Sequence, residues 1–367
     1  MSHVNYQTKI STALQMFSGT LSFIGSSLII FMIVLEWGKK NSLYYRLMLG
    51  LCIGEIFSSL AFVVNSLAIP VDSPGVWFAY GNEVTCAIQG VFFQIGLSVM
   101  FYNSALMIYF VLRIRYQKTE IWLKDKIEVW IHSIVIFTVI VTSAIGIQLD
   151  LFNNIGVICY VGSIPRNCNR TDKIPCDRGE HAIEFLWATG FAWFAATAIW
   201  LCISLCIIYR SVRKNEKLMI QKYSFAVTSS NYDAKVSFRE NTKSRQSILK
   251  RTLEIRNQAF RYAFIFLICY IWSILFQLAN IKNPRLLEIL RYAASFFQPI
   301  QGFFNFFNFV FLRIKRIRRR QNARNIFYAL YLVVFKTDTE LKQRALRKRS
   351  FRYIQNQQQN QQEESHT

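Results

Sequence analysis

Long, nearly uncharged apolar segments alternate with short polar connectors along most of the chain. Seven of these segments are 22 to 28 residues long. A helix of about 18 or more mainly apolar residues crosses the roughly 30 Å hydrocarbon core of a bilayer, and it satisfies its own backbone hydrogen bonds there. The pattern therefore predicts seven transmembrane helices, at residues 11–35, 44–69, 87–112, 127–148, 182–209, 259–280 and 287–312.

The first segment is the least apolar of the seven, because small residues interrupt it. These residues are Ser18, Gly19, Ser22, Gly25, Ser26 and Ser27. Small residues let helices approach closely in lipid, so we interpret the segment as a span. The alternative is a signal peptide, whose apolar region is about 7–15 residues long behind a positively charged start. The segment here is longer, and only Lys9 precedes it.

The residues that follow the seventh segment have a different pattern. Residues 313–320 are strongly basic, and residues 326–335 form an apolar run that is too short to span a bilayer. We predict a basic, amphipathic helix within residues 313–336 that lies in the membrane interface and contacts lipids. The remaining tail, residues 337–367, is Gln-rich from about residue 355 and is expected to be disordered there.

The distribution of charge predicts the orientation of the bundle. The chain has 43 Lys and Arg against 21 Asp and Glu. If the N-terminus is outside, 35 Lys and Arg lie in inner connectors or the tail and seven lie outside, as the positive-inside rule requires. Residues 1–10 are then a short extracellular N-terminus, and residues 210–258 a long basic cytoplasmic loop. We expect these charges to face anionic lipids rather than nucleic acid.

The cysteines fit the same topology. Four of the eight lie in spans, where a thiol usually packs as a small apolar group. The other four face the outside, where disulfides form, and they allow three pairings. These are Cys86, Cys159, Cys168 and Cys176. Asn169, followed by Arg170 and Thr171, is a glycosylation sequon in the same outer loop.

Several functional classes do not fit the sequence. A retinal protein needs a Schiff-base lysine in its last helix, and residues 287–312 contain none. We find no internal repeat of the kind that transporters show and no filter-like loop of a channel. The four histidines are scattered, and no metal-ligand spacing or phosphate loop is apparent. We therefore expect neither an enzyme nor a bound cofactor or metal.

Four motifs, in order along the chain, resemble those of the slime-mould cyclic-AMP receptors and their protist and fungal relatives. Together they cover roughly residues 10–315. The first is in the second span, where Glu55 stands in place of the usual Asp. The motifs are Tyr45-Arg46-Leu47 with Glu55 and Ser58-Ser59, Cys86-Ala87-Ile88-Gln89-Gly90, Gly156-Val157-Ile158-Cys159-Tyr160-Val161 and Gln298-Pro299-Ile300-Gln301-Gly302-Phe303-Phe304-Asn305.

The resemblance implies a G-protein-coupled receptor with a disulfide from Cys86 to Cys159. Cys168 and Cys176 are then left as a short local pair. The chain departs from the rhodopsin class, because Arg113-Ile114-Arg115-Tyr116 stands where Asp-Arg-Tyr would be. It also lacks Asn-Pro-x-x-Tyr in the seventh span.

Glu55 is predicted to lie near the middle of the membrane, since it is eleven residues beyond the start of the second span, about 16 Å along a helix. A carboxyl group at that depth is costly and usually faces the interior of the bundle. We interpret it as a polar switch with Asn103, Asn305 and Asn308 as partners. The alternative is a protonated packing residue, with the asparagines joining helices by hydrogen bonds.

Arg291 is expected about one turn inside the outer end of the seventh span. It could pair with Glu288 or extend to the interface. It could instead anchor a ligand in a cleft between helices. The residues expected around it in that case are Gln94, Glu184, Gln277 and Asn280.

On the inner face, Arg113 and Arg115 end the third span and are expected to contact a G protein, or simply to flank the membrane. Ser244, Ser247 and Ser350 lie among basic residues and are candidates for phosphorylation.

The sequence thus predicts an all-α membrane protein, a seven-transmembrane helix bundle over residues 11–312 with a short interfacial helix. We expect a plasma-membrane receptor that transmits an unknown extracellular ligand to a heterotrimeric G protein. The alternative is a seven-helix transporter or scaffold that does not signal.

Overall fold

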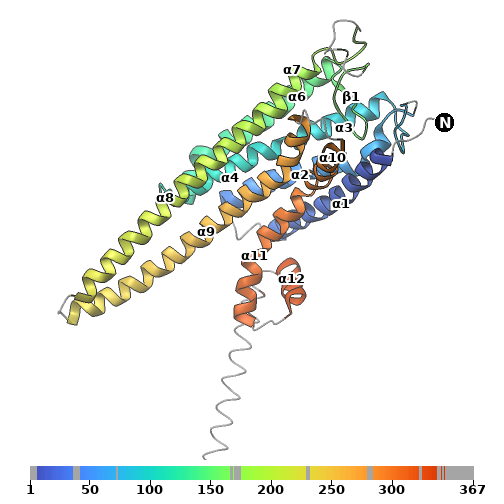
Figure 1. Ribbon diagram of the computed structural model, residues 1–367. Helices are drawn as coiled ribbons and strands as arrows, with labels where there is room; N and C mark the ends of the chain where they lie inside the picture. Colours follow the sequence, from blue (N-terminus) through green and yellow to red (C-terminus); the bar gives the residue numbers. More distant parts are fainter. Residues whose placement is uncertain are drawn as a thin grey trace, which may run out of the picture.

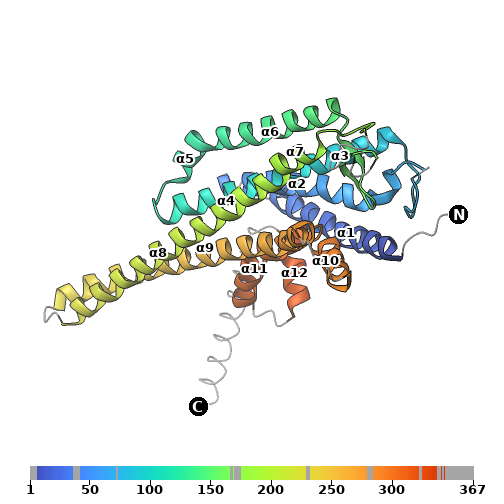
Figure 2. The same ribbon diagram turned by 45° about the horizontal axis from the view of Figure 1, so that its top comes forward.

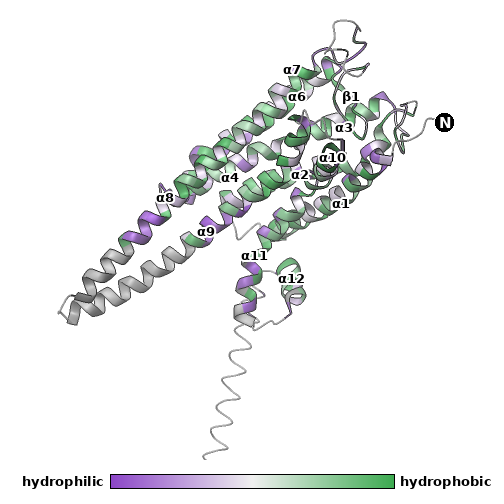
Figure 3. Ribbon diagram, viewed as in Figure 1, coloured by the Kyte–Doolittle hydropathy of each residue, from purple (hydrophilic) through white to green (hydrophobic). Residues whose placement is uncertain are grey.

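A computed structural model of the protein describes residues 6–35, 42–71, 73–165, 168, 175–228, 232–278, 284–321, 325–336, 340 and 343. Within them, six helices are long and apolar enough to cross a membrane. These helices run side by side in one elongated bundle (Figure 1), and apolar residues cover most of their length (Figure 3). The protein is therefore a multi-pass membrane protein with an all-α bundle.

The first two spans are α1 (Tyr6–Leu35) and α2 (Leu43–Val64), which continues as the short helix η2 (Asn65–Ala68). The buried side of α1 consists largely of small residues. A Cβ added to Gly25 would lie 2.8 Å from the carbonyl oxygen of Gly302, so the backbones of α1 and the last long helix are in close contact. The small residues thus allow the tight packing that the sequence predicted.

Each of the next three spans is made of more than one helical segment. The third is α3 (Glu83–Gly96) with α4 (Ser98–Ile114), and the fourth is α5 (Glu120–Leu123), η3 (Lys124–Glu128) and α6 (Val129–Gln148). The fifth is α7 (Ala182–Leu186), η5 (Trp187–Phe191) and α8 (Ala192–Thr228). The side chain of Asn82 caps α3 through the backbone N–H of Thr85, whose hydroxyl accepts from Asn82 in return.

The connection between the fifth and sixth spans differs from the sequence prediction. Residues 210–258 were expected to form a loop, but α8 continues to Thr228 and α9 (Tyr232–Leu278) begins four residues later. Both helices extend beyond the rest of the bundle (Figures 1 and 2). We call this the long-helix end of the bundle.

The seventh span predicted at residues 287–312 is not formed by one continuous helix. The structure has α10 (Pro284–Phe297) and α11 (Gln301–Gln321), separated by a turn at Gln298, Pro299 and Ile300. Pro299 has no N–H to donate and its ring clashes with the preceding turn, which explains a break at this position. Neither half counts among the six membrane-length apolar helices in the described part of the chain, because α10 has 14 residues and α11 runs into the basic segment.

A small antiparallel hairpin lies between α6 and α7. Its strands are β1 (Phe152–Asn154) and β2 (Cys159–Val161), and Asn153 pairs with Tyr160. No strand was expected here from the sequence. The hairpin lies at the same end of the bundle as the start of α1 (Figure 1), and we call this the strand end.

The last helix, α12 (Ile326–Phe335), coincides with the short apolar run seen in the sequence. Ala329, Leu332 and Val333 are buried, and Phe335 packs against Phe31 of α1 with ring centroids 6.3 Å apart. Its exposed side chains are aromatic, with Phe327 77% exposed. α12 contains no Lys or Arg, whereas α11 contains six.

Candidate functional site

Two disulfides lie at the strand end, with the pairing that the sequence analysis predicted. Cys86 at the start of α3 is bonded to Cys159 of β2, with Cα atoms 5.2 Å apart. Cys168 is bonded to Cys176, with Cα atoms 5.3 Å apart. The first disulfide anchors the hairpin to the bundle, because it joins β2 to α3. Its two cysteines are 73 positions apart in the sequence.

Gln89 provides a second attachment for the hairpin, and the sequence analysis assigned it no role. Its side chain is buried, and its Nε2 donates to the carbonyl oxygens of Ala61 and Asn65, at 2.8 and 2.7 Å. Its Oε1 accepts from the backbone N–H of Cys159 at 2.9 Å. One amide thus joins α3 to the end of α2 and to β2.

Phe152 of β1 fits between two glycines of the bundle. A Cβ added to Gly90 of α3 would lie 2.6 Å from the Phe152 side chain, and one added to Gly146 of α6 would lie 2.5 Å from its ring. Any larger side chain at either position would therefore push the hairpin away from the helices.

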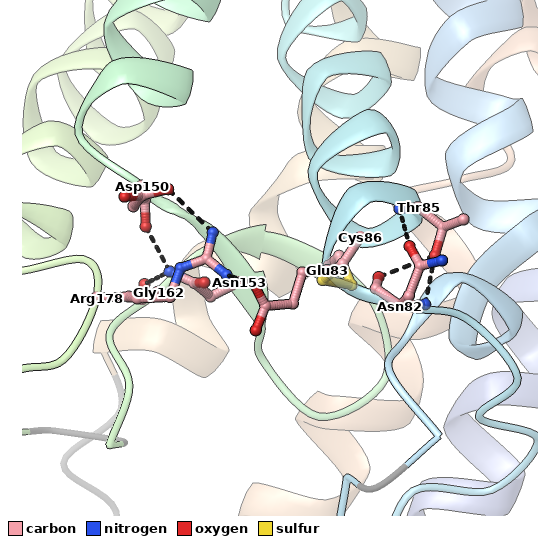
Figure 4. A network of polar contacts seen from close by, with 9 residues as sticks. Asn82, Glu83, Thr85, Cys86, Asp150, Asn153, Gly162 and Arg178 are labelled. Carbon is pink, nitrogen blue, oxygen red and sulfur yellow. Dashed lines mark hydrogen bonds and ion pairs between the residues drawn. A yellow bond between two sulfur atoms is a disulfide. The ribbon is translucent and has the colours of Figure 1, made fainter.

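The outer rim of the strand end holds a network of ion pairs and hydrogen bonds (Figure 4). Arg178 bonds Glu83 of α3 at 2.7 Å and Asp150, just after α6, at 3.0 Å. Asn153 donates to the backbone oxygens of Asp150 and Gly162. The network ties the segment before α7 to two other spans. It could not be predicted from the sequence, because its members are far apart along the chain.

A cavity of about 510 Å³ lies beneath the hairpin, between α1, α9 and α10 on one side and α3, α4 and α8 on the other. Its volume falls in the range of small-molecule sites. Most of its lining is apolar or aromatic. The aromatic lining residues are Phe62, Phe93, Tyr160, Phe191, Phe194, Tyr270 and Phe276. The turn of the hairpin, residues 155–158, covers one side of the cavity.

Two of the five residues predicted to bind ligand line this cavity, namely Gln277 and Arg291. The Arg291 guanidinium donates to Oε1 of Gln7 at 3.2 Å and lies over the ring of Phe276 at 5.6 Å from its centroid. The expected pair between Arg291 and Glu288 is replaced by a hydrogen bond from the Tyr292 hydroxyl to Glu288, at 2.7 Å.

The other three predicted ligand residues do not line the cavity. Gln94 is buried one layer behind it, where its Oε1 accepts from the Tyr160 hydroxyl at 3.0 Å. Glu184 is exposed on α7 and is not part of the lining, and Asn280 lies outside the described residues. Burial raises the pKa of the Tyr160 hydroxyl, so this group remains a neutral hydrogen-bond donor at the cavity wall.

Glu55 lies in the interior of the bundle, as predicted, and is 2% exposed. Its carboxyl accepts from the Ser26 hydroxyl of α1 at 2.6 Å and from Nδ2 of Asn305 in α11. The backbone N–H of Gly302, one turn before Asn305, donates to the Ser22 hydroxyl at 3.0 Å. We call Ser26, Glu55 and Asn305 the carboxyl cluster.

Two of the predicted partners of Glu55 have other contacts. Asn103 donates to the backbone oxygen of Val99 within its own helix, at 2.9 Å. Asn308 accepts from Nε of Arg261 at 2.6 Å. The cluster therefore joins α1, α2 and α11, and the sequence analysis missed Ser26 because it treated the small residues of α1 only as packing residues.

Arg113 contributes to a second polar cluster, at the long-helix end. The carboxylate of Glu120 accepts from the hydroxyls of Tyr109 and Ser42, at 2.7 and 3.1 Å, and lies 3.4 Å from Nε of Arg113. We call these four residues the Glu120 cluster. Arg115, by contrast, is exposed and lies over the ring of Tyr116.

The modification sites expected from the sequence are not described at side-chain level. Asn169 and Ser350 lie outside the described residues. Ser244 and Ser247 belong to residues 232–251 of α9, whose side chains are not described.

Compared with known proteins, the chain matches no protein-family model and no curated protein.

Proposed function

We propose that the protein is a cell-surface receptor that transmits the binding of a small molecule at the strand end to a heterotrimeric G protein at the long-helix end. In this proposal α10 and α11 together make the seventh crossing. The strand end faces the outside of the plasma membrane and the basic long-helix end faces the cytoplasm, as the distribution of Lys and Arg predicts. Asn169 is then an extracellular glycosylation site.

The observation that carries the proposal is the cavity of about 510 Å³ bounded by the same helices that extend to the opposite end. Tyr270 and Ser273 of α9 line the cavity, and Tyr262, two turns before Tyr270 on the same helix, bonds the Tyr44 hydroxyl at 2.8 Å toward the other end. A ligand that displaces α9 at the cavity would therefore also move the part of α9 at the face on which a G protein would dock.

The carboxyl cluster supports this reading, because it lies between the two ends and joins α1, α2 and α11 through buried hydrogen bonds. A buried network of this kind has few alternative arrangements, so a shift of α11 relative to α2 must break or exchange its bonds. It therefore fits a two-state element better than a simple packing contact.

The test is nucleotide exchange on a reconstituted G protein. We expect the purified protein in nanodiscs to accelerate exchange of GDP for a labelled GTP analogue on one member of a panel of heterotrimers, relative to empty nanodiscs. A chain that accelerates exchange on none of them is not a receptor of this class.

A transporter is the second candidate, and the break between α10 and α11 favours it. Discontinuous helices line the substrate sites of many transporters, usually in pairs from two repeats. The amide Nε2 of Gln301, at the start of α11, is buried without a hydrogen-bond partner among the described residues. Uptake of a solute into proteoliposomes, without any effect on nucleotide exchange, would favour this alternative.

A further inference from the structure

The charge of the cavity limits what it can bind. Among its lining residues, Arg291 is the only charged one in the described part of the chain. The guanidinium forms no ion pair with a described residue; its contacts are one hydrogen bond to Gln7 and the ring of Phe276. A partly enclosed cation without an anionic partner is costly, and an anion in the cavity would offset that cost.

A second, independent feature of the cavity also lacks a partner. Ser11 of α1 is 0% exposed and lines the cavity, and its hydroxyl has no hydrogen-bond partner among the described residues. A buried hydroxyl without a partner is unusual in a folded protein. A polar group of a bound molecule would supply the missing hydrogen bond.

The remaining lining determines the rest of the ligand. Aromatic and aliphatic side chains of several helices and of the hairpin surround the cavity, including Phe93, Met100 and Phe194. They suit an apolar or aromatic body rather than a sugar or an ion.

The number of cations that line the cavity indicates which charged group the ligand carries. A guanidinium binds a carboxylate through two parallel hydrogen bonds and neutralises its single charge. A phosphate carries more charge and more acceptors than one arginine satisfies, and sites for it usually add a second cation or a helix N-terminus. We therefore infer that the cavity binds an organic carboxylate with an apolar or aromatic body, whose carboxylate pairs with Arg291. This inference rests on the proposed function, since it gives the proposed receptor its class of ligand.

Binding can be tested with four probes that share one ring system, using calorimetry on the full chain in nanodiscs of zwitterionic lipid. The probes are 2-naphthoate, 2-naphthyl phosphate, 2-naphthylmethanol and 2-naphthylmethylamine. We expect naphthoate to bind about tenfold more tightly than the neutral alcohol, as a charge-assisted hydrogen-bonded pair predicts, and the amine to bind most weakly.

The variants compare two arginines of the same helix. Arg291→Gln should make naphthoate and the alcohol bind about equally, while Arg291→Lys should retain part of the preference. Arg285→Gln removes the same charge from an exposed position outside the cavity and should leave the preference unchanged. The ratio of the two affinities is the readout, so partial misfolding of a variant does not mimic the effect.

Four results would overturn the inference: no measurable naphthoate binding, binding no tighter than that of the alcohol, tighter binding of naphthyl phosphate, or a preference that survives Arg291→Gln. The proposed function is refuted by a different result. If the protein binds naphthoate through Arg291 but activates no G protein, the receptor function is wrong and the carboxylate site is still supported.

Discussion

The two ends of the bundle are held together in different ways. At the strand end, a disulfide, three hydrogen bonds of one buried glutamine and a tightly fitted phenylalanine attach the hairpin to α2, α3 and α6. At the long-helix end, the polar contacts between spans include those of Glu120, the Tyr44–Tyr262 pair and the ion pair of Arg46 with Glu128, beside aromatic packing such as that of Tyr44 on Phe309.

This difference indicates where the molecule can move. A covalent bond that joins segments 73 positions apart cannot exchange during a conformational change, whereas partly exposed ion pairs are worth roughly 1 kcal/mol or less each and can be replaced by water or by a partner. We therefore expect the strand end to remain fixed while the long-helix end opens.

Loss of the Cys86–Cys159 disulfide should have the largest effect. Its 73-residue separation gives a loop-entropy contribution of about 4 kcal/mol, against about 2.5 kcal/mol for the Cys168–Cys176 pair, which is 8 apart. Cys86→Ser with Cys159→Ser should therefore lower the free energy of unfolding, measured by denaturant titration, more than the matched change of the short pair. Equal losses would show that the hairpin is not held chiefly by the long-range bond.

Disruption of the carboxyl cluster should rank second. Glu55→Leu removes the acceptor of both Ser26 and Asn305 and leaves two buried donors unpaired, which should cost about 2 kcal/mol of stability. The control is Asn103→Leu, since Asn103 is equally buried but bonds only within its own helix.

The isosteric change separates a switch from a packing role. Glu55→Gln keeps an acceptor for Asn305 and should fold and reach the cell surface. If the cluster is a switch, this variant changes nucleotide exchange by the G protein. If basal and ligand-driven exchange are unaltered in Glu55→Gln, Glu55 is a packing residue and not a switch.

Weakening the Glu120 cluster should affect activity more than stability. Glu120→Gln removes the ion pair with Arg113 and weakens the bonds from Tyr109 and Ser42. If the variant lowers the free energy of the open state relative to the closed state by about 1 kcal/mol, basal nucleotide exchange should rise roughly fivefold. Asp125→Asn, an equal change of charge on an exposed residue near the start of the same span, should have no such effect.

The smallest effect is expected for Arg178→Gln. The carboxylates of Glu83 and Asp150 that it pairs with are 74% and 63% exposed, so the two ion pairs together should contribute less than about 1 kcal/mol. Thermal unfolding at low and high salt checks this. A larger loss than that caused by removing the short disulfide would contradict the view that Cys86–Cys159 and Gln89 hold the strand end.

Hydropathy was sufficient to predict most of the helices, because length and apolar content alone determine whether a segment can span a bilayer. It failed where a local property overrides the average. Pro299 breaks the seventh segment although residues 287–312 are apolar enough as a whole. The polar residues 210–258 have no apolar run, yet they continue α8 and α9 because helices can extend from helices that are already formed.

The functional residues were predictable only where one residue is chemically conspicuous. Glu55 and Arg291 stand out as charges in apolar segments, and both lie where a polar role is possible. Gln89 and Ser26 look ordinary in the sequence, and their roles depend on backbone groups and side chains of other helices that come close only in the fold.

Distances between pairs of spin labels show whether the long-helix end opens while the strand end stays fixed. One pair, at Tyr116 and Asn257, reports on the long-helix end, and the other, at Val84 and Leu278, reports on the strand end; all four side chains are exposed. The exposed Cys202 and Cys206 are first replaced by alanine. With Glu120→Gln, we predict that the Tyr116–Asn257 distance distribution gains a longer component while the Val84–Leu278 distribution is unchanged. A change confined to the Val84–Leu278 pair, or equal changes in both, would contradict the account.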